Sequence, residues 1–250
     1  PYGMLSPIGV YALATQRHMH LYGTTPEQLG EIAVATRKWA MLNPKAYKRE
    51  PLTLEDYLAS PFISEPLRRD DICLVTDGGG AVIVTRIERA RGLPKPPVVI
   101  EGIAERVSHH YWLAGVDDIL ELEMVRDTGR RAFAMAGLRP DDIDVLQLYD
   151  AFTIMPLLAV EALGFCERGE GGHFFANQRT APGGEIPVNT SGGGLSYCHP
   201  GMFGIFLIIE AVRQLRGECG ERQVQNPRHI LCHAYGGQWS ASATLILGRD

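Results

Sequence analysis

Residues 144–163, DVLQLYDAFTIMPLLAVEAL, contain the pattern that decides the fold. Asp144 to Leu148 is short and mostly apolar, which predicts a β-strand. Phe152 to Leu163 is apolar over a length that favours a buried helix. The polar pair Tyr149-Asp150 separates the two, so a strand passes almost directly into a helix. This stretch indicates an α/β protein with polar residues at the end of a strand.

The same alternation of helix and strand extends through the C-terminal half of the chain. Asp118 to Ala136 is a long amphipathic pattern closed by a glycine, which predicts a helix. Met202 to Leu215 predicts a helix buried on most sides, and His229 to Leu247 predicts two strands around a glycine-containing turn. Glu185 to Val188 fits a further short strand. We therefore expect a mixed sheet covered by helices.

The N-terminal part carries strong helix signals. Met4 to Tyr22 has apolar residues at helical spacing and stops at a glycine. Thr25-Pro26-Glu27-Gln28 has the residues of a capping box with Pro at the first helical position, which predicts a helix to about Asn43. Thr53 caps a predicted short helix through Leu58. Two β-rich runs predict strands in this part, Ala81 to Thr85 and Val98 to Glu105.

Composition and charge exclude several classes of function. The chain has 250 residues, of which 45% are hydrophobic, so it can bury a sizeable core. Its 24 Lys and Arg against 29 Asp and Glu give a net charge of −5 without long runs of one sign, which argues against a nucleic-acid partner. The longest apolar stretch is far shorter than the roughly 20 residues that cross a bilayer. We expect a soluble, cytoplasmic protein with no membrane partner.

Common metal, redox and nucleotide motifs do not occur in the chain. Its 5 Cys are scattered singly, an odd number without Cys-x-x-Cys spacing, which argues against a disulfide framework and a zinc ribbon. There is no Gly-x-Ser-x-Gly, no His-Glu-x-x-His and no P-loop or dinucleotide motif. The pair His109-His110 has no carboxylate at helical spacing beside it, so we interpret it as a loop or interface element. We expect no metal.

Three loops carry polar residues where a strand ends, and the first holds Tyr149 and Asp150. Asp150 is explained most simply as the N-cap of the following helix, although it is also a candidate substrate contact. Tyr149 is compatible with a core position, but a buried hydroxyl needs a partner. Both residues are therefore candidates whose role the residue types alone leave open.

The second loop, Asn189 to Gly201, reads NTSGGGLSYCHPG. Its consecutive glycines let the backbone approach a ligand closely. His199, held between Cys and Pro just before a buried helix, has few rotamers and suits a base or a hydrogen-bond donor. The candidate substrate contacts of this loop are Asn189, Gly193 and Gly194.

The third loop, Cys232 to Gly237, reads CHAYGG and lies at the end of a predicted strand. Gly236 and Gly237 again allow close backbone approach, and both are candidate substrate contacts. Cys232 and His233 are neighbours on a strand and so face opposite sides, which argues against a nucleophile–base pair between them. At most one of the two faces the crevice.

These three loops, in this order, resemble the C-terminal active-site loops of the thiolase superfamily, particularly of the sterol-carrier-protein-type thiolases and their lipid-transfer-protein relatives. Tyr22-Gly23-Thr24-Thr25-Pro26-Glu27, Asn43-Pro44, Leu58-Ala59-Ser60-Pro61 and Ser64-Glu65-Pro66-Leu67 resemble the loop region of that branch. The resemblance covers essentially the whole chain. It implies a layered αβαβα fold, with 1–114 as the latter part of the N-terminal domain and 115–250 as the C-terminal domain. It also implies that the family's acyl-accepting cysteine lies upstream of Pro1 and that the chain is a fragment.

The chain departs from the thiolase pattern at the residues that carry chemistry. Tyr149 stands where this branch has His or Asn, and Cys198 stands where it usually has Gly. His199 matches the family's base. The third loop keeps His233, but Ala234-Tyr235 replaces Asn and an apolar residue. These changes argue against thiolytic chemistry, because a phenol has replaced a group that donates to the thioester oxygen.

With a tyrosine in the first loop, the chain resembles the steroid side-chain-cleaving aldolases of the superfamily. These enzymes cleave a β-hydroxyacyl-CoA by retro-aldol chemistry. This resemblance implies proton transfer and oxyanion stabilisation by Tyr149 and His199, with Tyr197 or Tyr235 as a second phenol and His233 as a further catalytic candidate. It implies a steroid side-chain CoA thioester as substrate, a ketone and a short acyl-CoA such as propionyl-CoA as products, and no other cofactor. It also implies a homodimer and a partner protein of the OB-fold or zinc-ribbon type.

Two other functions stay open on the sequence. A degradative acetyl-CoA acetyltransferase or 3-ketoacyl-CoA thiolase would carry its nucleophilic cysteine upstream, and an acyl-enzyme trapped on the full-length protein would favour it. A non-catalytic lipid-transfer or scaffold protein would keep the fold without activity, because fold alone does not establish function.

Overall fold

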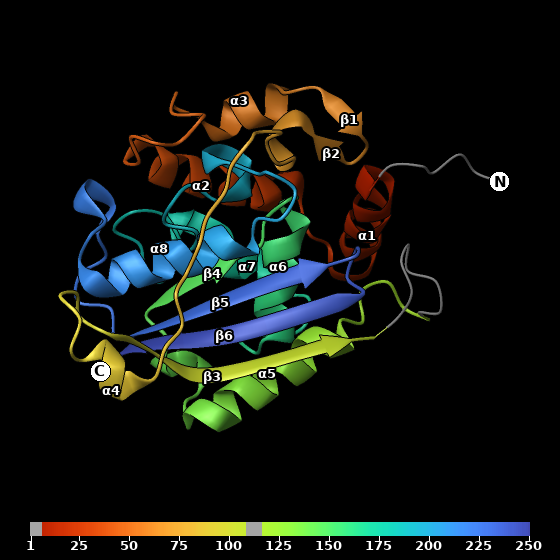
Figure 1. Ribbon diagram of the computed structural model, residues 1–250. Helices are drawn as coiled ribbons and strands as arrows, with labels where there is room; N and C mark the ends of the chain where they lie inside the picture. The colour runs from red at the N-terminus through yellow and green to blue at the C-terminus, as the bar shows by residue number, and fades with distance from the viewer. Residues whose placement is uncertain (1–6, 109–116) are drawn as a thin grey trace.

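The computed structural model describes residues 7–108 and 117–250, and its centre is a four-stranded sheet. The strands lie in the order β3 (Val98–Val107), β6 (Ala241–Arg249), β5 (His229–Gly236) and β4 (Val145–Leu148). β6 pairs antiparallel with both β3 and β5, whereas β4 runs parallel to β5. The predicted mixed sheet is therefore confirmed, as Figure 1 shows.

Helices cover both faces of this sheet. Helix α5 (Glu123–Ala136) packs on β3 and β6, and α8 (Gly204–Arg216) packs on β5 and β4 from the opposite side (Figure 1). Neighbouring residues of β5 show the two faces. The Cys232 thiol donates to the Leu207 carbonyl of α8, whereas His233 contacts Thr244, whose hydroxyl also contacts α5. The expectation that Cys232 and His233 face opposite sides is confirmed.

The predicted N-terminal helices are confirmed within the described residues. They are α1 (Pro7–Tyr22), α2 (Pro26–Met41) and α3 (Leu54–Ala59). Capping boxes start α2 at Thr25 and α3 at Thr53, because each threonine hydroxyl accepts a backbone N–H and the N3 side chain binds back. α3 leads into a small hairpin of β1 (Phe62–Ser64) and β2 (Leu67–Arg68).

The remaining elements are short, except for α6, which follows the first predicted loop. The three α-helices among them are α4 (Ile87–Ala90), α6 (Ile154–Ala162) and α7 (Gly171–Phe175). The short 3-10 helices are η1 (Arg69–Asp71), η3 (Pro140–Asp142), η4 (Ala176–Gln178) and η6 (Gly220–Arg222), and η5 (Gly193–Tyr197) is a π-helical turn.

The predicted strand from Ala81 to Thr85 is wrong. In Figure 1 this segment crosses the molecule as an extended chain between the β2 region and α4, and no described strand pairs with it. Ile83 is 94% exposed and Val84 is 73% exposed. β-branched side chains favour extended backbone, but a strand also needs a neighbour whose N–H and C=O groups complete its ladder.

Other boundaries differ by a few residues. α5 begins at Glu123 rather than Asp118, and Gly137 ends it with a φ of 68°. Glu185 to Val188 forms no strand, and Val188 instead makes an isolated parallel bridge to Leu146. The predicted domain boundary at 114/115 and the pair His109-His110 lie outside the described residues.

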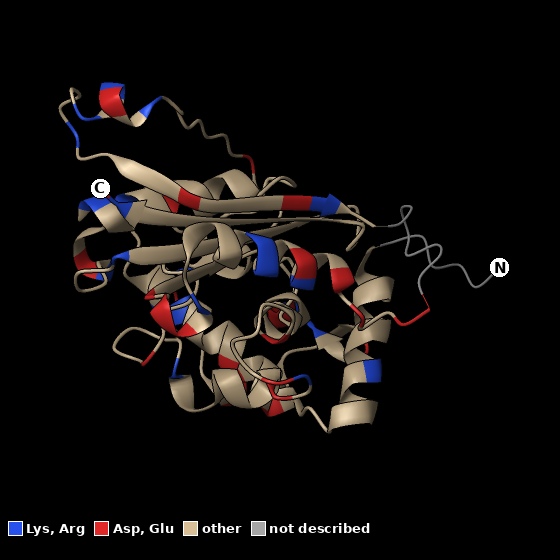
Figure 2. Cartoon of the chain, turned by 90° about the horizontal axis from the view of Figure 1, so that it is seen from below, with Lys and Arg blue, Asp and Glu red and all other residues tan. Residues whose placement is uncertain are grey.

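Charged residues of both signs are interspersed along the described residues, as Figure 2 shows. None of the helices between residues 7 and 108 or 117 and 250 is long and apolar enough to cross a bilayer. Across these same ranges, no three His, Cys, Asp or Glu side chains group together as metal ligands would.

Candidate active site

The structure brings Tyr149 of the first loop against His199 of the second loop. Tyr149 Oη lies 3.0 Å from His199 Nε2 and 3.2 Å from the Gly201 carbonyl, to which it can donate. The two rings are perpendicular, with centroids 5.6 Å apart. Tyr149 is only 9% exposed and His199 is partly buried, so a proton can pass between them in a site with little water.

The path of β4 explains why Tyr149 faces this way. Gln147, two residues earlier, donates to Thr190 Oγ1, which in turn donates to Glu210 of α8. Because strand side chains alternate, Tyr149 also lies on the α8 face of the sheet. Its ring packs against Phe203 at the start of α8, with centroids 5.9 Å apart.

Burial shifts the pKa values of both partners toward their neutral forms. It raises the pKa of the Tyr149 phenol, while a hydrogen bond with the Phe203 backbone lowers it by a smaller amount. Burial also lowers the pKa of His199 from its ordinary value. At neutral pH the pair is therefore a phenol beside a neutral imidazole, which is the arrangement of a proton donor and a base.

Asp150 lies beneath the glycines of the second loop and has no exposed surface. Its carboxylate accepts from the Gly194 N–H at 2.6 Å and from the Leu195 N–H at 3.5 Å. Desolvation raises the pKa of Asp150 to about 7. The interpretation of Asp150 as a helix N-cap is wrong, because α6 begins at Ile154 and Thr153 holds the cap position. Asp150 joins the first loop to the second.

The backbone of the second loop is tied to its surroundings. Asn189 has a φ of 53° and its side-chain oxygen accepts from the Leu148 N–H at 2.7 Å. Gly193 donates to Ser191 Oγ at 3.3 Å, and Gly194 is engaged by Asp150. A Cβ added at Gly193 would collide with the Asp150 carboxylate. These glycines allow two parts of the protein to approach each other closely.

Among the described residues, the other predicted catalytic residues make no hydrogen bond or ring contact with Tyr149 or His199. The Tyr197 ring packs against Phe206, with centroids 6.1 Å apart. Tyr235 donates to the Met155 carbonyl of α6 at 3.3 Å, and His233 contacts Thr244 at 2.9 Å. Tyr235 and His233 share the α5 face of β5, opposite the face of Tyr149.

His233 is fully buried on that face. Its Nε2 has no hydrogen-bond partner among the described residues. Desolvation lowers the pKa of His233 to about 3, so the ring is neutral over the physiological range. The environment of His233 is that of a core residue.

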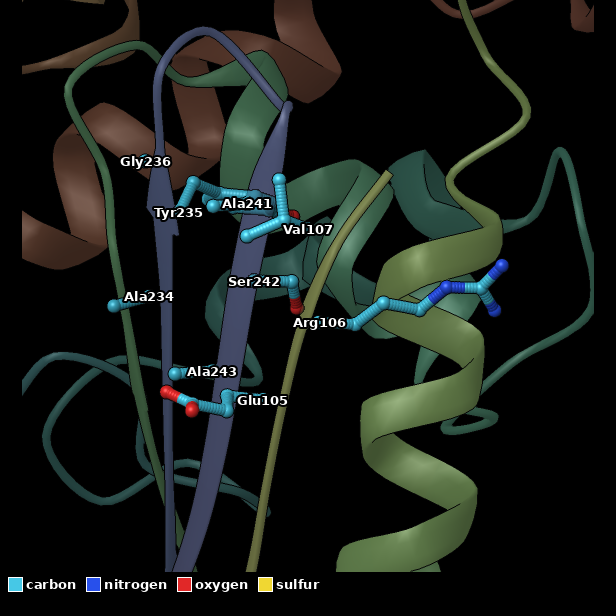
Figure 3. A pocket seen from close by; sticks show the side chains of 9 residues that line it. All are labelled: Glu105, Arg106, Val107, Ala234, Tyr235, Gly236, Ala241, Ser242 and Ala243. Atoms are coloured by element: carbon cyan, nitrogen blue, oxygen red, sulfur yellow. The ribbon is translucent and has the colours of Figure 1, made fainter. Parts of the chain in front are cut away.

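A pocket of about 420 Å³ opens at the end of the sheet where β5 turns into β6 (Figure 3). Tyr235 and Gly236 line it, and Gly237 lies in the adjoining turn with a φ of 54°. Figure 3 shows Arg106 pointing away from Glu105. Neither Tyr149 nor His199 is among the lining residues, which are Glu105, Arg106, Val107, Ala234, Tyr235, Gly236, Ala241, Ser242 and Ala243.

Sequence reasoning missed a segment that touches both the first and the second loop. The Cys73 N–H donates to the Ala151 carbonyl at 2.9 Å, and the Leu74 N–H donates to the Gly194 carbonyl at 3.0 Å. The His199 N–H donates to Thr76 Oγ1 at 3.0 Å. No local pattern identifies such contacts, because the partners are distant in sequence.

Comparison with known proteins gives consistent matches. Residues 105–249 match a family described as "Thiolase C-terminal domain-like". The chain is 41% identical to the 17-hydroxy-3-oxo-4-pregnene-20-carboxyl-CoA lyase of Mycobacterium tuberculosis over 99% of this chain, and 40% identical to the steroid side-chain-cleaving aldolase of Thermomonospora curvata over 100%. An acetyl-CoA acetyltransferase of Methanothermobacter thermautotrophicus is 39% identical over 96% of this chain.

A solved structure described as "Ltp2-ChsH2(DUF35) aldolase" superposes with a TM-score of 0.92 and 39% identity, covering 100% of this chain and 65% of that one. The chain spans 64% of the length of the lyase and of the steroid aldolase, and 63% of the acetyltransferase. It therefore corresponds to somewhat less than two thirds of each of these three relatives.

Proposed function

Because this chain belongs to the thiolase superfamily, we propose that it carries the acid–base site of an aldolase that cleaves a carbon–carbon bond in a β-hydroxyacyl-CoA. The observation that carries this proposal is the 3.0 Å contact between Tyr149 Oη and His199 Nε2. A buried phenol beside a neutral imidazole suits the removal of a proton from an alcohol. The names of the lyase and aldolase relatives support the same reaction class.

In the proposed reaction, Tyr149 passes its phenol proton to His199 Nε2 while Oη takes the proton of the substrate β-hydroxyl. The bond between Cα and Cβ then breaks, the hydroxyl carbon becomes the ketone carbon, and the electron pair moves to Cα and the thioester oxygen as an enolate. The proton on His199 returns through Tyr149 to Cα and gives the shortened acyl-CoA. Protons and electrons balance without an oxidant, a reductant or a covalent intermediate.

The local backbone supports charge on the phenol oxygen during this transfer. The Phe203 backbone, at the N-cap of α8, hydrogen-bonds the phenol and lowers its pKa against the larger effect of burial. A helix N-terminus favours negative charge. Tyr149 can therefore carry a transient phenolate more easily than burial alone would allow.

The thiols near the pair are poor nucleophiles. Burial raises the pKa of Cys198 to about 11 and that of Cys73 to about 12, so both are protonated at neutral pH. This supports a reaction without an acyl-enzyme on a cysteine of this chain. Tyr197 stays a candidate for a second proton-transfer group. Tyr235 and His233 lie on the opposite face of the sheet, and the proposed reaction assigns them no step.

We propose a steroid side-chain CoA thioester as the substrate, with a ketone and a short acyl-CoA such as propionyl-CoA as the products. The lyase relative is named for a pregnene carboxyl-CoA, and the aldolase relative is named for steroid side-chain cleavage. We further propose a homodimer that binds a partner of the OB-fold or zinc-ribbon type, since the matched aldolase structure is named for two proteins. The division into 1–114 and 115–250 and a cytoplasmic location are part of the same proposal.

The test uses the full-length protein with its partner and a steroid side-chain β-hydroxyacyl-CoA. We expect ketone and short acyl-CoA in equal amounts, with no dependence on added free CoA. The acetyltransferase relative favours a second candidate, a degradative thiolase. Cleavage that requires free CoA and passes through a trapped acyl-enzyme would establish that candidate and overturn the aldolase proposal.

A further inference from the structure

Residues 71–76 form a segment, here called the strap, that is fixed at both ends to the catalytic loops. At its start, the Asp71 backbone carbonyl accepts from the Thr153 N–H at 3.0 Å, just beyond the first loop. The buried Asp71 carboxylate also accepts from the Tyr57 hydroxyl at 2.8 Å. This end of the strap is therefore held by buried hydrogen bonds to α3 and to the start of α6.

The strap then passes along both loops in turn. Cys73 donates to Ala151, two residues after Tyr149, and Leu74 donates to Gly194 of the second loop. Leu74 is also buried, with 6% of its surface exposed. Two consecutive residues of the strap therefore hydrogen-bond to the two loops, which fixes the distance between the loops.

At its far end the strap hydrogen-bonds to both the N–H and the carbonyl of His199. Thr76 Oγ1 accepts from the His199 N–H at 3.0 Å, and the Thr76 N–H donates to the His199 carbonyl at 3.4 Å. The hydroxyl contact is the shorter of the two and so the stronger. A residue whose N–H and C=O are both engaged has little backbone freedom. The point from which the His199 ring extends toward Tyr149 is therefore fixed.

We propose that Thr76 is a positioning residue that holds His199 Nε2 at hydrogen-bonding distance from Tyr149. The inference rests on the proposed function where turnover is the readout, and on the geometry alone where the histidine itself is observed. Catalysis is sensitive to this kind of displacement, since a shift of about 1 Å can cost about 10²-fold in rate.

The experiment compares Thr76→Val with Thr76→Ser in the full-length protein with its partner. Valine keeps the branched shape but removes the acceptor, whereas serine keeps the hydroxyl. We expect Thr76→Val to lower kcat by about 10- to 100-fold with little change in KM, and Thr76→Ser to restore most of the rate. Thr85→Val, an exposed site in the extended segment that follows the strap, is the matched control and should behave as wild type.

A second readout does not depend on activity. NMR titration of the His199 ring, assigned by its loss in His199→Ala, reports its surroundings directly. We expect the pKa of His199 to rise toward its ordinary value in Thr76→Val, because a displaced ring meets more water, and to stay unchanged in Thr76→Ser and Thr85→Val.

The outcomes separate the two proposals. Wild-type protein that fails to cleave the substrate overturns the proposed function, and the titration alone then decides the role of Thr76. Unchanged kcat and unchanged titration in Thr76→Val overturn the inference, as does an equal loss in Thr76→Ser. If Thr76→Val does not fold, Thr76→Ala against Thr76→Ser makes the same comparison.

Discussion

Tyr149→Phe removes one oxygen from the candidate site and leaves the aromatic ring in place. That oxygen lies 3.0 Å from His199 Nε2 and 3.2 Å from the Gly201 carbonyl. At about 1 kcal/mol net for a hydrogen bond, the free energy of unfolding should fall by about 1–2 kcal/mol. For a chain of this size, each kcal/mol corresponds to about 2–4 °C in Tm. The fold should survive.

Turnover should respond far more strongly than stability. A positioned acid–base group contributes about 10²-fold or more, which corresponds to about 2.7 kcal/mol in activation free energy. We expect this loss in Tyr149→Phe and a comparable one in His199→Ala. The assay follows release of the short acyl-CoA from a β-hydroxyacyl-CoA, with a melting curve measured on the same preparation.

Tyr235→Phe is the informative comparison. It deletes the same atom from a tyrosine whose hydroxyl donates to the Met155 carbonyl at 3.3 Å on the other side of the sheet. We expect a similar small loss of stability with turnover within a few-fold of wild type. A Tyr149→Phe protein that turns over normally, or a Tyr235→Phe protein that loses activity while Tyr149→Phe keeps it, would refute the reasoning.

Three further predictions address thiols, pH and the glycine loop. Cys198→Ala and Cys232→Ala should each retain substantial turnover, because burial raises the pKa of both thiols; complete loss of activity in a folded Cys198→Ala protein would contradict this. The pKa of His233 is about 3 when folded against an ordinary value of 6.5, so the unfolded chain binds more protons between these values and stability falls as pH drops from 6.5 toward 3. Denaturant titrations at several pH values give the free energy of unfolding as a function of pH. In His233→Gln this free energy should fall less steeply between pH 6.5 and 3, by up to about 1.4 kcal/mol per pH unit, and an unchanged pH dependence would count against burial of a neutral ring. Gly193→Ala should lower the free energy of unfolding by more than about 2 kcal/mol through collision with Asp150, whereas Gly183→Ala, with positive φ but open space, should cost about 1 kcal/mol; equal losses in thermal unfolding would reject the collision.

The helices could be predicted because their signals are local. Thr25 and Thr53 cap their helices through residues three positions away, and Gly137 ends α5 by its own left-handed backbone. The run Ala81 to Thr85 has equally strong β-propensity, yet no described strand lies beside it. Propensity describes one chain segment, whereas a sheet is a property of two.

The candidate site could be predicted in part from the sequence, for a related reason. The residue types and order of the loops identified Tyr149 and His199 as candidates, and the structure places them in contact. Alternation along β5 separates Cys232 from His233, but it does not say which of them shares a face with Tyr149. That depends on the pairing of Leu148 with His233, which joins segments far apart in the chain. Thr76 gives no local signal at all.

The contact between Asp150 and the glycine turn has a consequence for how such sequences can diverge. The carboxylate occupies the space that a side chain at position 193 would need, and its oxygens bind the turn's N–H groups. A larger residue at 193 becomes tolerable only once position 150 has shrunk, and a shrunken 150 leaves buried N–H groups without an acceptor. A side chain at 193 would also keep the strain of its positive φ, and a smaller residue at 150 would need another acceptor to replace it. The two substitutions should therefore have coupled, non-additive effects on stability, so this junction can change only when several residues change together.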